Sequence, residues 1–151
     1  MGPAGGAVTQ SLGTFHHIGF VVASIPTSVP GFLDSLQAVW DGTIFHDPHQ
    51  SVRVTFLRPK RPGNPLFELV EPAGEKSPVI PFLKRGGGLH HLCYEIDNLE
   101  QQLALSRSEG GLVVRQPLPA VAFEGRRIAW VYTKNQLLVE YLESQRGPAQ
   151  E

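Results

Sequence analysis

Two parts of this chain repeat one another, and this repetition constrains the fold more than any other feature of the sequence. His17 and His91 each end a His-His pair at the start of a short apolar stretch, and they lie 74 positions apart. Each pair is followed about fifty residues later by a Glu inside an apolar run, and these residues, Glu68 and Glu140, lie 72 positions apart. The sequence therefore predicts two copies of one structural unit, each contributing one His and one Glu.

Composition narrows the classes of protein that this chain can represent. A chain of 151 residues corresponds to one domain. Its net charge of −1 and pI of about 6.6 give no basic footprint for nucleic acid. Cys93 is the single cysteine, so no disulfide forms within the chain and nothing points to secretion. No apolar run is long enough to cross a membrane. We expect a cytoplasmic protein that binds neither nucleic acid nor membrane.

The pattern of apolar residues predicts an α+β fold in which strand, helix and three strands occur twice. We expect one domain, residues 15–145, made of modules 15–72 and 88–145, with flexible tails at 1–14 and 146–151. The first helix should begin at a Ser28 cap and end at Asp41-Gly42. The second should begin at a capping box of Asp97 and Glu100. A short helical turn is expected between the modules, near residues 80–84.

The two glutamates need a physical explanation because each lies within an apolar strand. A Glu on a one-sided sheet can simply face solvent, but the period of a strand gives each of these Glu a face shared with aliphatic side chains. Leu66 and Val70 flank Glu68 in this way, and Leu138 and Leu142 flank Glu140. An unpaired carboxylate is costly inside a protein, and a divalent cation removes that cost.

The histidines complete the predicted metal site. A lone His on an apolar strand is often a hydrogen-bonded core residue, but two His and two Glu at repeat-related positions favour a metal. Because neighbours on a strand face opposite ways, we expect His17 and His91 to enter the cleft and His16 and His90 to point to the opposite face. The predicted ligands suit octahedral Co, Mn, Ni or Zn with two positions left for water or substrate: His17, Glu68, His91 and Glu140.

One rival cluster is visible in the sequence. His46, Asp47 and His49 could form a metal site at the surface, although Pro48 between them is typical of a turn.

With these motifs the chain resembles the vicinal oxygen chelate superfamily, which includes glyoxalase I, ring-cleaving dioxygenases and bleomycin-resistance proteins. Within it, the chain is most similar to the methylmalonyl-CoA epimerases. The resemblance implies a glyoxalase-like fold: two tandem βαβββ modules forming a curved mixed sheet around a metal-binding cleft. It maps the metal ligands of the family onto the same four residues. The motifs that carry it are His17-Ile18-Gly19, 67–72, Ser77-Pro78-Val79, 87–92, 95–98 and 138–140.

The resemblance also implies a reaction. A divalent metal would polarise a thioester carbonyl, Glu140 would take the α-proton as base, and Glu68 would be its partner. The implied substrate is an acyl-CoA or other thioester, and a homodimer is expected by analogy. A further Glu that is proposed for proton transfer in one bacterial relative would fall near Val54 of this chain.

Two other functions fit the same sequence. One is a glyoxalase-type lactoylglutathione lyase or another lyase of the superfamily. The other, from a different class, is a non-catalytic module that binds a small molecule, as in drug resistance. A ring-cleaving dioxygenase fits less well, because such enzymes use two His and one carboxylate on iron and this chain offers a fourth ligand.

Overall fold

The computed structural model describes residues 12–145, which form a single nine-stranded mixed sheet with few helices. The predicted order of elements is confirmed, with one additional short strand in the first unit. The first unit contains β1 (Thr14–Val21), α1 (Ile25–Leu36), β2 (Ala38–Val39), β3 (Phe45–Asp47), β4 (Val52–Pro59) and β5 (Leu66–Pro72). After α2 (Ile80–Lys84), the second contains β6 (Gly88–Ile96), α3 (Leu99–Ser108), β7 (Leu112–Pro119), the 3-10 helix η1 (Val121–Phe123), β8 (Arg127–Tyr132) and β9 (Leu138–Glu143).

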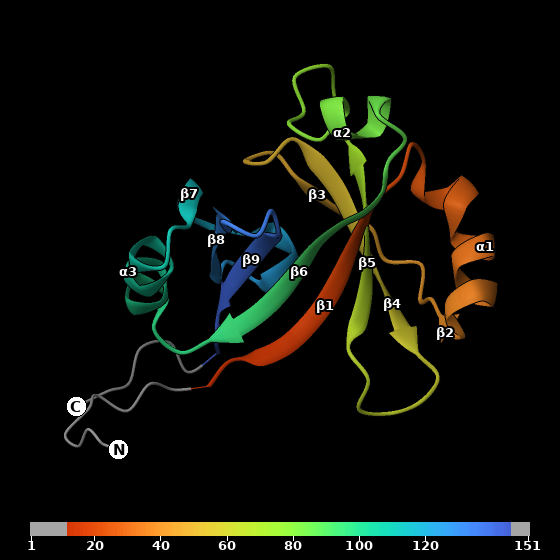
Figure 1. Cartoon of the computed structure of the whole chain (residues 1–151). Coiled ribbons are helices and arrows are strands. Elements are labelled where there is room, and N and C mark those ends of the chain that lie inside the picture. The colour runs from red at the N-terminus through yellow and green to blue at the C-terminus, as the bar shows by residue number, and fades with distance from the viewer. Residues whose placement is uncertain (1–11, 146–151) are drawn as a thin grey trace.

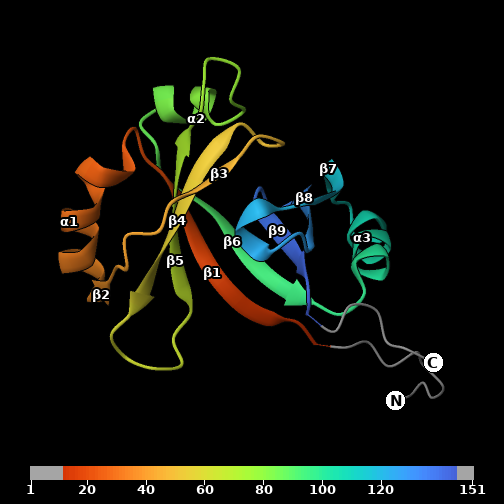
Figure 2. The same cartoon turned by 180° about the vertical axis from the view of Figure 1, so that it is seen from behind.

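The two units join through the antiparallel pair β1 and β6 at the centre of the sheet. The strand order is β2-β4-β5-β1-β6-β9-β8-β7, with β3 paired to β4. In each unit the first strand pairs in parallel with the last, β1 with β5 and β6 with β9. Figures 1 and 2 show β4, β5 and α1 on one side of the curved central pair, and β8, β9 and α3 on the other. This topology brings the His-bearing and Glu-bearing strands of both units side by side.

Each long helix covers the outer face of its own half of the sheet. Ile25 of α1 is fully buried in a cluster with Leu57 and Leu69. Leu99 of α3 is fully buried in the corresponding cluster with Val131. Burying side chains of this size stabilises the fold by about 1.5–3 kcal/mol each relative to exposure. Neither α1 nor α3 covers the opposite, concave face, where Phe123 of η1 stacks on the ring of His17.

A repeated ion pair on the outer face shows that the two units share detailed chemistry. Arg53 Nε lies 2.5 Å from Glu71 Oε2, and Arg127 Nη2 lies 2.7 Å from Glu143 Oε2. The arginines are 74 positions apart and the glutamates 72. Glu71 also accepts a hydrogen bond from the backbone N–H of Ile25, which ties the last strand of the unit to the start of α1.

The first helix lies earlier in the chain than predicted. Ser24, not Ser28, is the cap, because its hydroxyl accepts from the backbone N–H of Thr27. The helix ends at Gln37, whose φ of 52° is left-handed, and not at Asp41-Gly42. The next residues leave the helix because β2 pairs with the edge of β4. Tertiary pairing thus overrides the helical spacing of the apolar residues there.

The second helix follows the prediction except at its cap. Asn98 accepts from the backbone N–H of Gln101 and is the cap in place of Asp97. Asp97 instead accepts from the hydroxyl of Ser144. The predicted tails at 1–14 and 146–151 lie almost wholly outside the described residues, although Thr14 already belongs to β1. No helix within residues 12–145 has the length and apolar character needed to cross a bilayer.

Candidate metal centre

Four strands meet at the concave face, and each delivers one of the four predicted side chains. The parallel register of β1 and β5 sets Gly19 opposite Glu68, and that of β6 and β9 sets Cys93 opposite Glu140. One ligand atom from each residue lies within 4.8 Å of the others, and all four residues are buried: His17, Glu68, His91 and Glu140. The structure therefore brings together the complete predicted set.

The separations of these atoms suit a single cation. His17 Nε2 lies 3.3 Å from Glu68 Oε1, 3.2 Å from Glu140 Oε1 and 3.3 Å from His91 Nε2. His91 Nε2 lies 3.0 Å from Glu68 Oε1 and 3.5 Å from Glu140 Oε1. Ligands at about 2.0–2.2 Å from one metal are separated by roughly 2.9–3.5 Å. In addition, Glu140 Oε1 is buried with no hydrogen-bond donor. The donor set thus fits a divalent metal.

The electrostatics of the cluster attract positive charge. Burial lowers the pKa of the His17 imidazole, but Glu68, Cys93 and Glu140 together raise it by more, so the pKa lies well above its usual value. The pKa of His91 is likewise raised, because its contacts with Glu140 and Glu68 outweigh burial. Burial raises the pKa of both carboxylates, but the two imidazoles lower it by more. The pKa of each carboxylate therefore lies below its usual value, and both stay ionised. Two buried anions therefore face two nitrogen atoms that can take a proton or a metal.

The expectation that His16 and His90 point away from the cleft is wrong. The pairing of β1 with β6 shifts register between Phe15 and His17 and again between Gly19 and Phe20. The first shift is a bulge at His16 and the second a bulge at His90, and a bulge breaks the alternation of side chains. Nδ1 of His16 lies 2.8 Å from Nδ1 of His17, and Nδ1 of His90 lies 2.8 Å from Nδ1 of His91.

Gly19 leaves room for the His91 ring, because it has no side chain. A Cβ added to Gly19 would lie 2.0 Å from Cε1 of His91. In the second unit, Cys93 takes the equivalent position and is fully buried. Burial raises the pKa of its thiol to about 12, so Cys93 remains a neutral thiol.

Aromatic rings outside the predicted set of site residues pack around the imidazoles. Phe56 and Trp130 occupy repeat-related positions, and each lies opposite a proposed Glu ligand across its strand pair. The Phe56 ring is 5.5 Å from the ring of His17, and the Trp130 ring is 4.7 Å from that of His91. Phe56 and Trp130 lie 74 positions apart, as His17 and His91 do, and this offset is the signal in the sequence that could have predicted them.

A cavity of about 300 Å³ opens beside the cluster, and most of its wall is apolar. Gln50 and Arg115 are polar residues on its wall that the sequence did not single out. Gln50 is held by Trp130, whose Nε1–H donates to Gln50 Oε1 at 3.1 Å. The other lining residues are Val52, Val54, Glu68, Val70, Pro78, Val79, His90, His91, Val114, Trp130, Leu138 and Glu140.

The rival surface cluster does not form. Asp47 is buried, and its carboxylate accepts from the backbone N–H of His49 and from the side-chain amide of Gln50. His46 is exposed. Within residues 12–145, the clusters of candidate ligand atoms all include His17, so these residues are not a metal site of their own.

Comparisons with known proteins agree with this geometry. Residues 16–130 match the model of the Glyoxalase/Bleomycin resistance protein/Dioxygenase superfamily. The chain is 27% identical over 133 residues to an ethylmalonyl-CoA/methylmalonyl-CoA epimerase of Cereibacter sphaeroides, covering 85% of this chain and 96% of the relative. It is 33% identical over 84 residues to a mitochondrial methylmalonyl-CoA epimerase of Dictyostelium discoideum, covering 53% of this chain and only 50% of that longer relative.

A solved structure extends the comparison to three dimensions. The crystal structure of methylmalonyl-CoA epimerase from Mycobacterium tuberculosis superposes with a TM-score of 0.74 and 25% identity. The superposition covers 96% of this chain and 95% of that one. The predicted glyoxalase-like fold is thereby confirmed over nearly the whole chain.

The close approach at Gly19 generates a first prediction. Gly19→Ala should displace the His91 ring, lower the free energy of unfolding by about 1–3 kcal/mol and weaken Co(II) binding. Gly31→Ala is the matched control, because nothing lies within 4 Å of its added Cβ and helical Ala is favoured by about 0.5–1 kcal/mol. Denaturation and Co(II) titration measure both variants. Wild-type Co(II) affinity and stability in Gly19→Ala would contradict the close packing of Gly19 against the His91 ring.

The raised histidine pKa values generate a second prediction, on stability and pH. Protonated His17 and His91 stabilise the chelator-treated protein. This stabilisation is fully present below the unfolded-state histidine pKa of about 6.5 and is lost as the pH rises through the raised folded-state pKa values. The lowered pKa values of Glu68 and Glu140 stabilise it above about 4.3, and this is lost at lower pH.

We therefore expect the Tm of the chelator-treated protein to be higher at about pH 6 than at about pH 8. Added Co(II) should raise the Tm more at the higher pH, because metal competes with protons for the imidazoles. The double variant Glu68→Gln, Glu140→Gln serves as control and should lose most of the pH difference. A higher Tm at pH 8 without metal would contradict the charge arrangement.

Proposed function

The chain belongs to the Glyoxalase/Bleomycin resistance protein/Dioxygenase superfamily, and from this membership we propose that it is a divalent-metal-dependent epimerase of acyl-CoA thioesters, of the methylmalonyl-CoA type. The observation that carries the proposal is the buried set of two imidazoles and two carboxylates beside an apolar cavity. The epimerase names of the bacterial relative and of the superposed structure support this choice of reaction.

The four residues that would hold the metal are His17, Glu68, His91 and Glu140. Two carboxylates balance the charge of a dication, so the site would be neutral overall, which favours burial. Bound there, a divalent metal supplies a Lewis acid that stabilises the negative charge developing on a thioester carbonyl oxygen as the α-proton leaves. Octahedral metals such as Co, Mn, Ni or Zn suit the mixed nitrogen and oxygen set.

Glu140 is the base in this proposal. It lines the cavity, its pKa is low enough to keep it ionised, and its Oε1 has no hydrogen-bond donor. A carboxylate of this kind can accept the α-proton of a substrate held beside it. Glu68 also lines the cavity but reaches it from β5, on the other side of the β1–β6 pair. Two carboxylates on opposite sides of one seam suit a reaction that removes a proton from one face and returns it to the other.

The cavity suits the acyl part of such a substrate. Its volume of about 300 Å³ is at the lower limit for ligand pockets, so the nucleotide part of CoA would lie outside it. The apolar wall, which includes Val54 and Val70, excludes water from the reacting carbon. Arg115 lines the same cavity and is fixed by donating from Nη2 to the carbonyl of His49 at 2.7 Å. Its guanidinium is available to pair with a substrate carboxylate.

A glyoxalase-type lyase is the second candidate, and the residue at position 54 favours keeping it. Val54 lies near where a relative has a further Glu proposed for proton transfer. The acidic residues that line the cavity are therefore the two proposed metal ligands, Glu68 and Glu140. Proton transfer by a ligand carboxylate alone serves a lyase or isomerase of either substrate class. A binding module without chemistry is the alternative of a different class. Substrate and exchange assays separate the three.

Deuterium exchange tests the proposal directly. In heavy water, methylmalonyl-CoA should gain deuterium at its α-carbon when Co(II)-loaded protein is added, and the chelator-stripped protein should be inactive. Metal-dependent uptake would support the epimerase. Tight metal binding without uptake would discard this substrate, and turnover of the hemithioacetal of methylglyoxal and glutathione would then identify a lyase. No turnover of either would favour the binding module.

The role of the base generates a separate prediction. Glu140→Gln should retain the fold and lose at least about 10²-fold of the exchange rate, because an amide cannot accept the proton. Glu143→Gln, on the same strand but paired with Arg127 on the outer face, is the matched control and should keep the wild-type rate. Full exchange activity in Glu140→Gln would exclude it as the base.

A further inference from the structure

Each proposed histidine ligand is preceded by a second histidine whose ring contacts it. We propose that His16 and His90 are positioning residues, each accepting a hydrogen bond from the Nδ1–H of the ligand that follows it. This hydrogen bond holds His17 and His91 in the tautomer whose Nε2 is unprotonated and faces the proposed metal. The inference rests on the proposed metal centre and adds two residues to it.

The backbone makes this contact available through irregular pairing. A regular strand would send adjacent side chains to opposite faces. The two register shifts in the β1–β6 pair remove that alternation at His16 and at His90. Bulges of this kind often re-aim a side chain beside an active site. Because one bulge lies on each strand of the pair, both units acquire the same His-His contact.

The 2.8 Å separation of the two Nδ1 atoms in each pair fixes the hydrogen bonding. Two ring nitrogens at this distance share one proton, so one nitrogen donates and the other accepts. The Nε2 atoms of His17 and His91 lie 3.3 Å apart and face two carboxylate oxygens, so a metal there requires both to be unprotonated. A neutral imidazole with a bare Nε2 carries its proton on Nδ1. The ligand therefore donates, and His16 or His90 accepts.

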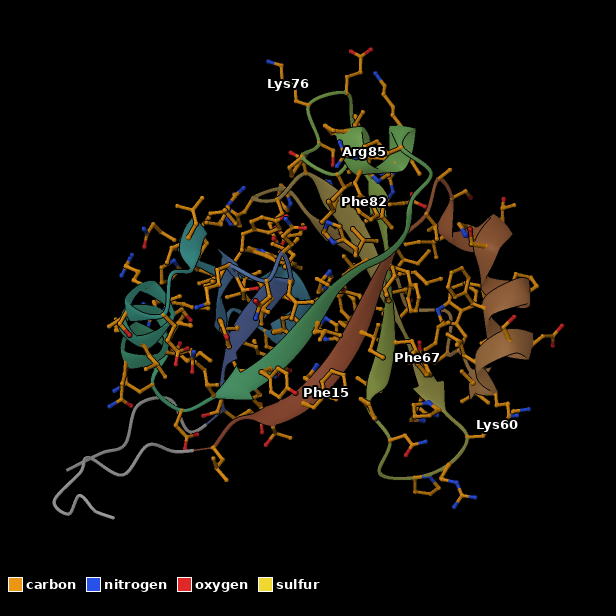
Figure 3. The ribbon with its side chains drawn as sticks, viewed as in Figure 1. Phe15, Lys60, Phe67, Lys76, Phe82 and Arg85 are labelled. Atoms are coloured by element: carbon orange, nitrogen blue, oxygen red, sulfur yellow. The ribbon has the colours of Figure 1, made fainter. Side chains whose placement is uncertain are left out.

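Aromatic packing holds each accepting ring in place. The ring of His16 lies 5.5 Å from that of Phe123 and 6.3 Å from that of Phe56, both edge-on. The ring of His90 lies 4.8 Å from that of Phe82 and 6.2 Å from that of Trp130. Figure 3 shows the side chain of Phe82 projecting from α2 toward the sheet. A ring fixed by packing restricts the orientation of the ligand that donates to it.

The same arrangement occurs twice, and its repetition argues for a function. Both contacts join adjacent residues, have the same length and involve the same pair of atoms. His16 and His90, like His17 and His91, are separated by 74 positions. Partners that orient a metal ligand in this way typically contribute about 10- to 100-fold to metal affinity.

The experiment compares two kinds of substitution at both positions. The double variant His16→Phe, His90→Phe keeps a ring but removes the acceptor, and its Co(II) affinity should fall roughly 10- to 100-fold in a competition titration with a chelator. His16→Asn, His90→Asn places an amide oxygen near the lost Nδ1 and should recover most of that affinity. His46→Phe is the matched control, because His46 is exposed and lies outside the cluster.

Nitrogen NMR of the Zn(II)-loaded wild-type protein tests the tautomers without any substitution. His17 and His91 should carry their protons on Nδ1, and His16 and His90 should have unprotonated Nδ1 atoms. Protons on Nδ1 of His16 and His90, or wild-type Co(II) affinity in the Phe variant, would overturn the inference while leaving the metal centre standing. Failure of the wild-type protein to bind Co(II) or Zn(II) would overturn both.

Discussion

Two carboxylates buried beside two imidazoles are the interaction on which the rest of this structure depends. Glu68 and Glu140 are almost inaccessible to solvent, and each shares its strand face with aliphatic side chains. Buried anions destabilise a fold unless positive charge lies against them. Protonated His17 and His91 can supply that charge, and a divalent metal can supply it at higher pH. Stability and the proposed chemistry therefore make the same demand on this cluster.

The duplicated topology explains how one small chain meets that demand. Neither unit supplies all four proposed ligands, since each contributes one imidazole and one carboxylate. The antiparallel pairing of β1 with β6 places the units side by side. The parallel pairing of β5 with β1 and of β9 with β6 then brings a carboxylate to each flank of this central pair. A helix covers the outer face of each unit, and the concave face is left for the cavity.

The two bulges change how the His-His pairs should be understood. As members of a regular strand, His16 and His90 would have no role at the cluster, whereas in the irregular pair they contact the proposed ligands. Gly19 belongs to the same arrangement, because a side chain there would occupy the place of the His91 ring. The seam between the units thus carries the ligands, their hydrogen-bond partners and the space that they need.

The duplicated α+β fold and the convergence of His17, Glu68, His91 and Glu140 could be predicted from the sequence alone, because apolar periodicity and a fixed offset are properties of the chain. The direction of His16 and His90, the cap of α1 and the place of Gln50 and Arg115 on the cavity wall follow only from the folded structure. Each of these depends on which strands pair and in what register. A bulge is set by the fit between two distant strands, and neither strand's own sequence specifies it.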